Sequence, residues 1–172
     1  MELINLGTTR SIANHLLAEV RDKFRQTDRQ RFRKNMERLG EMMAYEISRT
    51  LPYTTRQVET PLKSVFVPVL AQQPVLITVL RAGIPYFQGF QNFFDQADCG
   101  FIGAYRKEGT GEIKINFDYL ATPSLHGQIV ILIDPMLATG KSFIRSVQEL
   151  ERHGVPNHLH VASLIAAPEG IQ

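Results

Sequence analysis

The sequence has little of what marks secreted, membrane-spanning or strongly charged proteins. Cysteine occurs once and tryptophan not at all, which excludes an internal disulfide framework and fits a reducing compartment. No apolar run approaches the ~18 residues of a transmembrane helix, and the N-terminus has no basic region before an apolar segment, as a secretory signal would. The formal net charge of +2 gives no case for nucleic acid or a membrane as a partner. We therefore expect a cytoplasmic protein.

What is present fits one soluble domain spanning residues 1–172. Of these residues 44% are hydrophobic, enough for a sizeable core, and no internal repeat or low-complexity segment divides them. Residues 11–50 have apolar side chains at helical spacing and predict N-terminal helices, the second of them opened by a capping box at Thr27–Gln30. Residues 21–38 are rich in Arg and Lys, but interleaved acids favour a solvated helix face over a nucleic-acid surface. The core is expected over residues 65–172.

The most informative stretch is Val130–Ser142. Its first four residues are apolar and mostly β-branched, as in a parallel-sheet strand buried on both faces. Asp134 ends this strand, and a loop of small residues leads into a helical pattern that continues to His153. In open α/β sheets, ligands bind beyond the carboxyl ends of strands, where such a loop offers backbone N–H groups, hydroxyls and a helix N-terminus. The stretch 138–142 therefore predicts a phosphate site, and Asp134 suits the hydroxyls of an attached sugar.

The same loop ends in Gly140-Lys141-Ser142, which looks like part of a nucleotide-binding P-loop. A P-loop requires glycine five residues before Gly140, where this chain has Pro135. Proline cannot take a positive φ and has no N–H to offer a phosphate. Asp134, just before it, would repel nucleotide phosphates. A P-loop phosphotransferase is therefore the disfavoured alternative.

A second apolar strand, residues 75–80, precedes Arg81-Ala82-Gly83 and a helical pattern over residues 84–95. Two buried strands that deliver polar residues to one sheet edge are expected of a doubly wound site. Gly83 would allow close backbone approach to a ligand. The alternative for Arg81 is a surface salt bridge, but charged residues are rarely placed at the end of a buried strand without a purpose.

Residues 99–105 predict the next strand, followed by a polar, glycine-rich loop over residues 106–112 and a hairpin strand over residues 113–119. Such a loop can close over a reactive intermediate and exclude water; an ordinary solvated hairpin loop is the alternative. Cys99 has no local base, so we interpret it as a buried thiol rather than a nucleophile.

Several other features have structural interpretations. Residues 50–64 are expected to form a connecting segment. Residues 65–70 could form a strand, which Pro68 either confines to a sheet edge or breaks. The phenylalanines of residues 87–94 and the methionine stripe of residues 36–43 favour core or subunit contacts over a ligand site. His158 and His160 share one face of a strand expected over residues 157–165, but with no third ligand nearby a metal site is disfavoured.

Residues 134–140, Asp-Pro-Met-Leu-Ala-Thr-Gly, resemble the type I phosphoribosyltransferases and, among them, the uracil phosphoribosyltransferase family. The match to that family's loop is residue by residue, although Lys141 replaces the glycine common at the next position. Arg81-Ala82-Gly83 resembles the family's diphosphate loop, and Tyr105-Arg106 matches a site where its arginine reaches the diphosphate. The resemblance implies an α/β fold: an open parallel sheet flanked by helices, with an N-terminal helical arm and a β-hairpin.

The resemblance also implies an activity, the transfer of the phosphoribosyl group from 5-phosphoribosyl diphosphate (PRPP) to uracil, which gives UMP and diphosphate in pyrimidine salvage. Asp134, Arg81 and Arg106 are the catalytic residues that it implies. Mg²⁺ would be held mainly by PRPP and water, because this ion takes few protein ligands. The substrate-binding residues implied are Arg81, Ala82, Gly83, Arg106, Asp134, Pro135, Met136, Leu137, Ala138, Thr139, Gly140, Lys141 and Ser142.

The sequence ends in a loop entering a helix at Pro168, where the uracil enzymes continue with a segment that reads the pyrimidine edge. We expect either an incomplete chain or a domain without that base-binding segment. The second case leaves a non-catalytic PRPP- or nucleotide-binding regulator as the alternative function. Some relatives respond to GTP, but no residue pattern places such a site. The aromatic and methionine stripes favour a homodimer or larger homo-oligomer.

Overall fold

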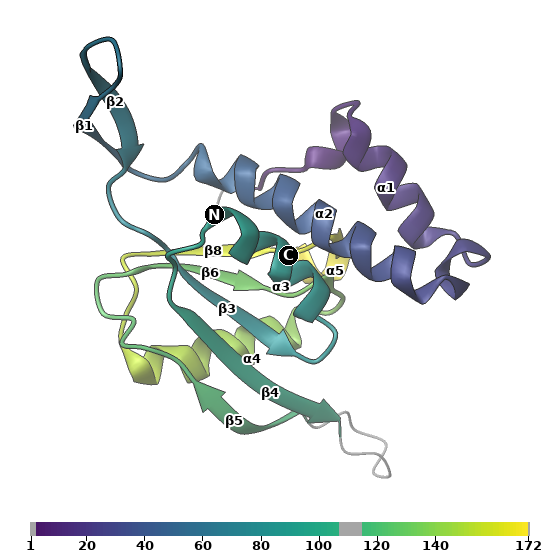
Figure 1. Cartoon of the computed structure of the whole chain (residues 1–172). Coiled ribbons are helices and arrows are strands. Elements are labelled where there is room, and N and C mark those ends of the chain that lie inside the picture. Colours follow the sequence, from purple (N-terminus) through teal and green to yellow (C-terminus); the bar gives the residue numbers. More distant parts are fainter. Residues whose placement is uncertain (1–2, 107–114, 172) are drawn as a thin grey trace.

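The computed structural model describes residues 3–106 and 115–171 and is built around a five-stranded sheet (Figure 1). The strand order is β5-β4-β3-β6-β8. Four strands run parallel, and β5 is antiparallel at one edge. The strands are β3 (Val75–Leu80), β4 (Cys99–Arg106), β5 (Ile115–Ala121), β6 (Ile129–Ile133) and β8 (His158–Ala162). The α/β fold with a mostly parallel sheet is thereby confirmed.

Helices cover both faces of this sheet (Figure 1). The N-terminal helices α1 (Ile12–Arg21) and α2 (Arg29–Ser48) lie on one side with α3 (Ile84–Phe93), and α4 (Lys141–Leu150) lies on the other. A hydrophobic core lies on each face of the sheet. Alternate residues of one strand pack into the two cores, because successive strand side chains point to opposite faces. Ile131 and Ile133 pack on the α2–α3 side, whereas Val130 and Leu132 pack on the α4 side. This double burial is why the strands are continuously apolar.

Helices α2 and α3 meet through two glycines. A Cβ added at Gly40 would clash with the Tyr86 carbonyl, and one added at Gly89 would clash with the Glu37 carbonyl. The Asn92 side chain reinforces the contact by donating hydrogen bonds to Glu37 at 3.0 Å and to Glu41 at 2.7 Å. The two helix backbones are therefore in direct contact.

Side-chain hydrogen bonds set the end of α1 and the start of α2. Helix α1 stops at Arg21, where the Asp22 side chain accepts a hydrogen bond from the Phe24 N–H at 2.8 Å. The expected capping box at Thr27–Gln30 is wrong by one residue. Thr27 belongs to a 3₁₀ turn, Arg25–Thr27, and Asp28 caps α2 by accepting from the Arg31 N–H at 3.0 Å.

The expectation of a connecting segment at residues 50–64 is wrong. Strand β1 (Tyr53–Glu59) pairs antiparallel with β2 (Ser64–Leu70), and this hairpin projects from the body of the molecule (Figure 1). Strand β1 is mostly polar and exposed, so no apolar pattern marks it in the sequence. The strand predicted at residues 65–70 is confirmed, with Pro68 opposite Thr55 in this two-stranded ribbon.

The C-terminal part also differs from expectation. The single strand predicted over residues 157–165 is two: β8, and β9 (Ile165–Ala166), which pairs with β7 (Met136–Leu137). Helix α4 ends at Leu150, and a 3₁₀ turn, Glu151–His153, replaces its predicted last turn before Gly154 at φ +121°. Pro168 begins the short helix α5 (Pro168–Ile171), as expected.

The aromatic side chains of residues 87–94 lie mostly in the core, as interpreted, while the cysteine is less buried than expected. Phe87, Phe90 and Phe94 are buried in the core, while Phe93 is 49% exposed. Cys99 is half-buried, and this burial raises the pKa of its thiol, which argues against a nucleophile. Within the described ranges, no helix combines the length and apolar character needed to cross a bilayer.

Candidate active site

The carboxyl ends of β3 and β6, which are neighbours in the sheet, open onto a cavity of about 650 Å³. This is the position that the parallel topology predicts for a ligand. The cavity wall contains nine of the residues expected from the sequence. They are Arg81, Ala82, Asp134, Pro135, Met136, Ala138, Thr139, Gly140 and Ser142.

Two buried contacts hold the strand ends together. The Thr78 hydroxyl donates a hydrogen bond to the Ile133 carbonyl at 2.9 Å. Gly83 packs against the same hydroxyl, and a Cβ at Gly83 would clash with it and lie 2.9 Å from the Val79 carbonyl. Glycine is thus required at residue 83 for the turn after β3 to fold back on that strand, and Gly83 does not itself line the cavity. The Leu80–Arg81 peptide bond at this turn is cis.

Asp134 is half-buried at the end of β6. Burial raises the pKa of its carboxyl, and the Met136 N–H, which donates to Oδ1 at 3.1 Å, partly opposes that rise. The backbone of Asp134 is fixed to the neighbouring strand by two bonds. Its N–H donates to the Ala162 carbonyl at 3.2 Å, and its carbonyl accepts from the Ser163 hydroxyl at 2.7 Å. The carboxylate therefore has a defined position in the cavity wall.

The loop after Asp134 leads directly into α4. Gly140 precedes the helix at φ +73°, a left-handed conformation that favours glycine, and no side chain caps the helix start. The first N–H groups of α4 therefore remain available to an anion at the cavity wall. Lys141 is exposed and lies outside the cavity wall, and the Leu137 side chain packs into the core beside α4. The structure therefore does not bring these two predicted side chains to the cavity.

The segment after β8 supports this loop from behind. The Ile165 N–H donates to the Pro135 carbonyl at 3.1 Å, and the Ala167 N–H donates to the Leu137 carbonyl at 2.8 Å. Gly170 approaches so closely that an added Cβ would lie 2.6 Å from the Ala138 carbonyl. Sequence reasoning missed this support, because two-residue strands leave no periodic signal.

The N-terminal helices form the opposite wall, which was also not anticipated. Arg21 is the last residue of α1, Gln26 comes from the α1–α2 connection, and Phe32 and Met36 come from α2. Met36 is buried in the core as predicted, so the core interpretation of the methionine stripe is confirmed but incomplete. A basic segment and an apolar stripe do not indicate by themselves which cavity they border.

Glu19 joins the two helices of this wall. Its carboxylate accepts hydrogen bonds from Arg31 Nε at 2.7 Å and from Asn35 Nδ2 at 2.7 Å. The Arg31 guanidinium, followed by the Asn35 amide, lowers the pKa of Glu19 to about 2. The Glu19 carboxylate thus holds α1 against the start of α2, next to the cavity residues Val20 and Arg21.

Arg106 is the last residue of β4 and pairs with Ile115 of β5. The predicted closing loop spans residues 106–112, of which residues 107–112 lie outside the described residues. The assignment of Arg106 and of that loop stays a prediction.

The family resemblance implies a Mg²⁺ ion, and the side chains of the site can be compared with the ligands that this ion requires. Among residues 3–106 and 115–171, no group of three or more His, Cys, Asp or Glu could hold a metal ion. Asp134 is the one carboxylate in the described wall of the cavity. Magnesium at phosphate sites uses one or two carboxylates and takes its other ligands from substrate and water. The donor set therefore fits an ion that binds together with a phosphorylated substrate.

Two solved structures that share this architecture are named as phosphoribosyltransferases. A purine phosphoribosyltransferase from Pyrococcus horikoshii superposes with a TM-score of 0.56 at 14% identity, covering 78% of this chain and 74% of that one. A hypoxanthine phosphoribosyltransferase from Staphylococcus aureus gives a TM-score of 0.57 at 12% identity, covering 79% and 65%. Identities this low show the fold alone, which is that of the type I phosphoribosyltransferases.

Sequence comparison is more specific. The family model described as "Uracil phosphoribosyltransferase" matches residues 7–172. The uracil phosphoribosyltransferase of Porphyromonas gingivalis is 43% identical over 175 residues, which cover 99% of this chain and 80% of the relative. That of Burkholderia ambifaria is 41% identical, covering 96% and 75%. The AQ2163 protein from Aquifex aeolicus superposes with a TM-score of 0.83 at 29% identity, covering 95% and 76%. The chain belongs to the uracil phosphoribosyltransferase family.

Proposed function

We propose that this chain transfers the phosphoribosyl group of PRPP to uracil at the cavity between β3, β6 and the N-terminal helices. One observation carries the assignment: Arg81, Asp134 and the loop 138–142 lie around one cavity in a member of this family. In the reaction a uracil ring nitrogen forms a bond to the anomeric carbon of PRPP. The bond from that carbon to the diphosphate breaks, the diphosphate leaves with the electron pair, and the ring nitrogen loses its proton.

The phosphate end of the substrate is assigned to the start of α4. Free N–H groups and the positive end of the helix dipole favour an anion there. Thr139 and Ser142 in the cavity wall add hydroxyl donors, and Gly140 lets the backbone approach closely. Lys141 would contribute through its backbone N–H, and its exposed ammonium would add a longer-range attraction.

Asp134 is assigned to the ribose hydroxyls. In the transition state positive charge develops on the ribose ring, and a carboxylate fixed beside the ring stabilises that charge. The hydrogen bonds that fix its backbone and its carboxylate support this role, because positioned charge requires little reorganisation.

Arg81 and Arg106 are assigned to the diphosphate. Arg81 borders the cavity and makes no salt bridge within the described part of the chain, so its guanidinium is free for an anionic substrate. Bound Mg²⁺ would neutralise charge on the diphosphate, and Asp134, the one carboxylate in the described cavity wall, could serve as its protein ligand. Met136, which is 63% exposed, and Ala138 would form an apolar wall against the base.

Three further expectations belong to the same proposal. The chain would fold as one domain, with the N-terminal helices as a cavity wall rather than a separate unit. It would act in the cytoplasm. It would also form a homo-oligomer, since Leu62 and Phe66 of the projecting hairpin are 95% and 72% exposed. Light scattering coupled to size-exclusion chromatography would give the mass in solution.

A direct assay tests the activity. Labelled uracil, PRPP and Mg²⁺ are incubated with the purified chain, and UMP and diphosphate are expected to appear in equal amounts. PRPP binding measured calorimetrically without any UMP would favour the non-catalytic regulator. Absence of both binding and turnover would overturn the assignment of the phosphate loop. Family membership supports the enzyme over the regulator.

A further inference from the structure

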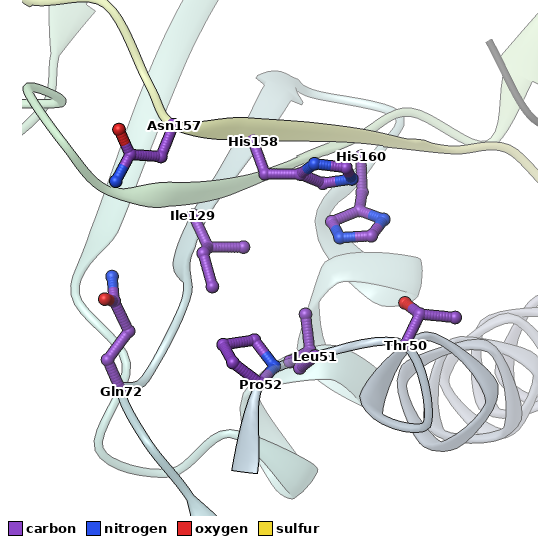
Figure 2. A pocket seen from close by; sticks show the side chains of 8 residues that line it. All are labelled: Thr50, Leu51, Pro52, Gln72, Ile129, Asn157, His158 and His160. Carbon is purple, nitrogen blue, oxygen red and sulfur yellow. The ribbon is translucent and has the colours of Figure 1, made fainter.

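A second cavity, of about 300 Å³, lies at the other end of the parallel strands. Ile129 and His158 are the first residues of β6 and β8, whereas the candidate active site lies beyond the last residues of β3 and β6. The two cavities share no lining residue. The lining residues of the second cavity, all labelled in Figure 2, are Thr50, Leu51, Pro52, Gln72, Ile129, Asn157, His158 and His160.

Two imidazoles dominate the polar part of this cavity. His158 and His160 are two residues apart on β8, so their side chains leave the same face of the strand. Their ring centroids are 4.4 Å apart and the ring planes are inclined at 54°. Figure 2 shows both rings beside one another on the β8 side, facing the segment Thr50–Pro52 across the opening. Leu51 and Ile129 supply a buried apolar floor.

The side chains that line this cavity limit the class of ligand that it can bind. No Lys, Arg, Asp or Glu is found among the described residues that line this cavity. Without guanidinium or ammonium groups the site does not suit a phosphate or carboxylate. Without carboxylates it does not suit Ca²⁺ or Mg²⁺, which prefer oxygen ligands. Imidazole nitrogens are ligands for zinc, copper and nickel ions.

The geometry is compatible with a shared ion. A tetrahedral metal with bonds of ~2.0–2.1 Å to imidazole requires the two ligating nitrogens to approach within about 3.4 Å. The two ring centroids are 4.4 Å apart, so small rotations of the side chains would bring one nitrogen of each ring to that separation. The sequence shows no third His, Cys or acidic ligand nearby. The fold brings Thr50 and Gln72 to the cavity from distant positions, but the Thr50 hydroxyl donates to the Ile47 carbonyl at 2.8 Å and the Gln72 amide donates to Gln128 at 3.2 Å, which leaves solvent to complete the coordination.

We propose that His158 and His160 together bind a divalent transition-metal ion, Zn²⁺ in the first instance, with solvent completing the coordination. This site is independent of the Mg²⁺ assigned to PRPP and of the phosphoribosyl transfer. Because two positions of the ion stay open to solvent, the site can also accept an additional ligand from outside the chain.

Metal titration of the intact chain tests the site. The protein is stripped with chelator and titrated with Zn²⁺ alone, in competition with a chromophoric chelator. We expect one ion per chain. His158→Gln and His160→Gln should each weaken binding by about tenfold or more, because a single imidazole then remains. His153→Gln is the matched control: His153 is exposed in the turn after α4, does not line the cavity, and should leave affinity unchanged.

A spectroscopic readout on the unaltered protein guards against variants that fail to fold. Cu²⁺ bound at the site should show electron paramagnetic resonance splitting from two imidazole nitrogens, reduced to one in each variant. Equal loss of affinity in His153→Gln would overturn the proposal. So would unchanged affinity in both β8 variants, or a copper signal without two nitrogen ligands.

Discussion

The Thr78 hydroxyl donates a 2.9 Å hydrogen bond to the Ile133 carbonyl and has no exposure to solvent. This bond joins β3 three residues before Arg81 to β6 one residue before Asp134. The two proposed catalytic side chains therefore follow strands that already pair with each other, and this buried side-chain bond reinforces the pairing at the end nearest the cavity.

Replacing Thr78 should affect both stability and substrate affinity. Thr78→Val keeps the shape but leaves the Ile133 carbonyl without this donor, which should cost about 1–3 kcal/mol of unfolding free energy. It should also raise KM for PRPP, because the Arg81 turn loses its fixed position. Thr78→Ser keeps the hydroxyl and should restore KM. Denaturant unfolding and initial rates measure the two effects, and an unchanged KM in the valine variant would contradict the positioning role.

Asp134→Asn should abolish transfer without destabilising the fold. Burial raises the folded-state pKa of Asp134, so the folded chain binds this proton more tightly than the unfolded chain. Ionisation therefore destabilises the fold above the folded pKa, and that effect vanishes below the ordinary value of about 4. The asparagine variant should be as stable as the parent or more so at pH 7, with the difference narrowing as the pH falls through the raised folded-state pKa and closing by about 4.

The measurement is thermal unfolding across pH, together with the UMP assay. Asp95→Asn, which changes an exposed carboxylate away from the cavity, is the control and should retain activity. Turnover retained in Asp134→Asn would count directly against the proposed site.

Gly170→Ala should impair PRPP binding although Gly170 is not in the cavity wall. The added Cβ would lie 2.6 Å from the Ala138 carbonyl and 2.9 Å from the Leu137 carbonyl, so the phosphate loop must shift. We expect a higher KM for PRPP with a smaller change in kcat. Gly7→Ala, where the nearest atom is the flexible Asn5 side chain at 3.1 Å, should leave both constants unchanged. Isothermal titration with PRPP gives an independent reading, and equal affinity in the two variants would refute the support role.

Glu19→Gln should weaken the cavity wall in a pH-dependent way. The pKa of Glu19 is lowered to about 2 in the fold. Its stabilising contribution is therefore complete above the unfolded value of about 4.3 and is lost as the pH falls toward 2. The variant should melt below the parent at pH 7, and the gap should close in acid. Glu46→Gln breaks an exposed pair with Arg49 and should have little effect. A gap that stays constant from pH 7 to pH 2.5 would disprove the electrostatic explanation.

The predictable parts of the fold are those where burial leaves a strong pattern. Strands β3 and β6 are apolar on both faces, and the polar residues that end them, Arg81 and Asp134, could be placed at one sheet edge from topology alone. Strand β1 could not be predicted, because it is stabilised by pairing with β2 rather than by burial. The β7–β9 pair is two residues long and has no period to detect.

Some residues of the candidate site could likewise be predicted from the sequence, and others could not. Loop residues such as Thr139 and Gly140 are contiguous in sequence, and their chemistry is local. Phe32 and Met36 reach the cavity only because α2 packs across the sheet, which is a tertiary fact that helical spacing does not contain. Their apolar stripe indicates burial but not the surface against which they are buried.

The glycine contact between α2 and α3 has a mechanical consequence. At Gly40 and Gly89 the helices touch backbone to backbone, with no flexible side chain between them to absorb a displacement. Helix α2 carries one wall of the cavity, and α3 starts immediately after the turn that holds Arg81. Tilting α2 would therefore move α3 by a comparable amount. The width of the cavity and the position of the Arg81 turn would then change together.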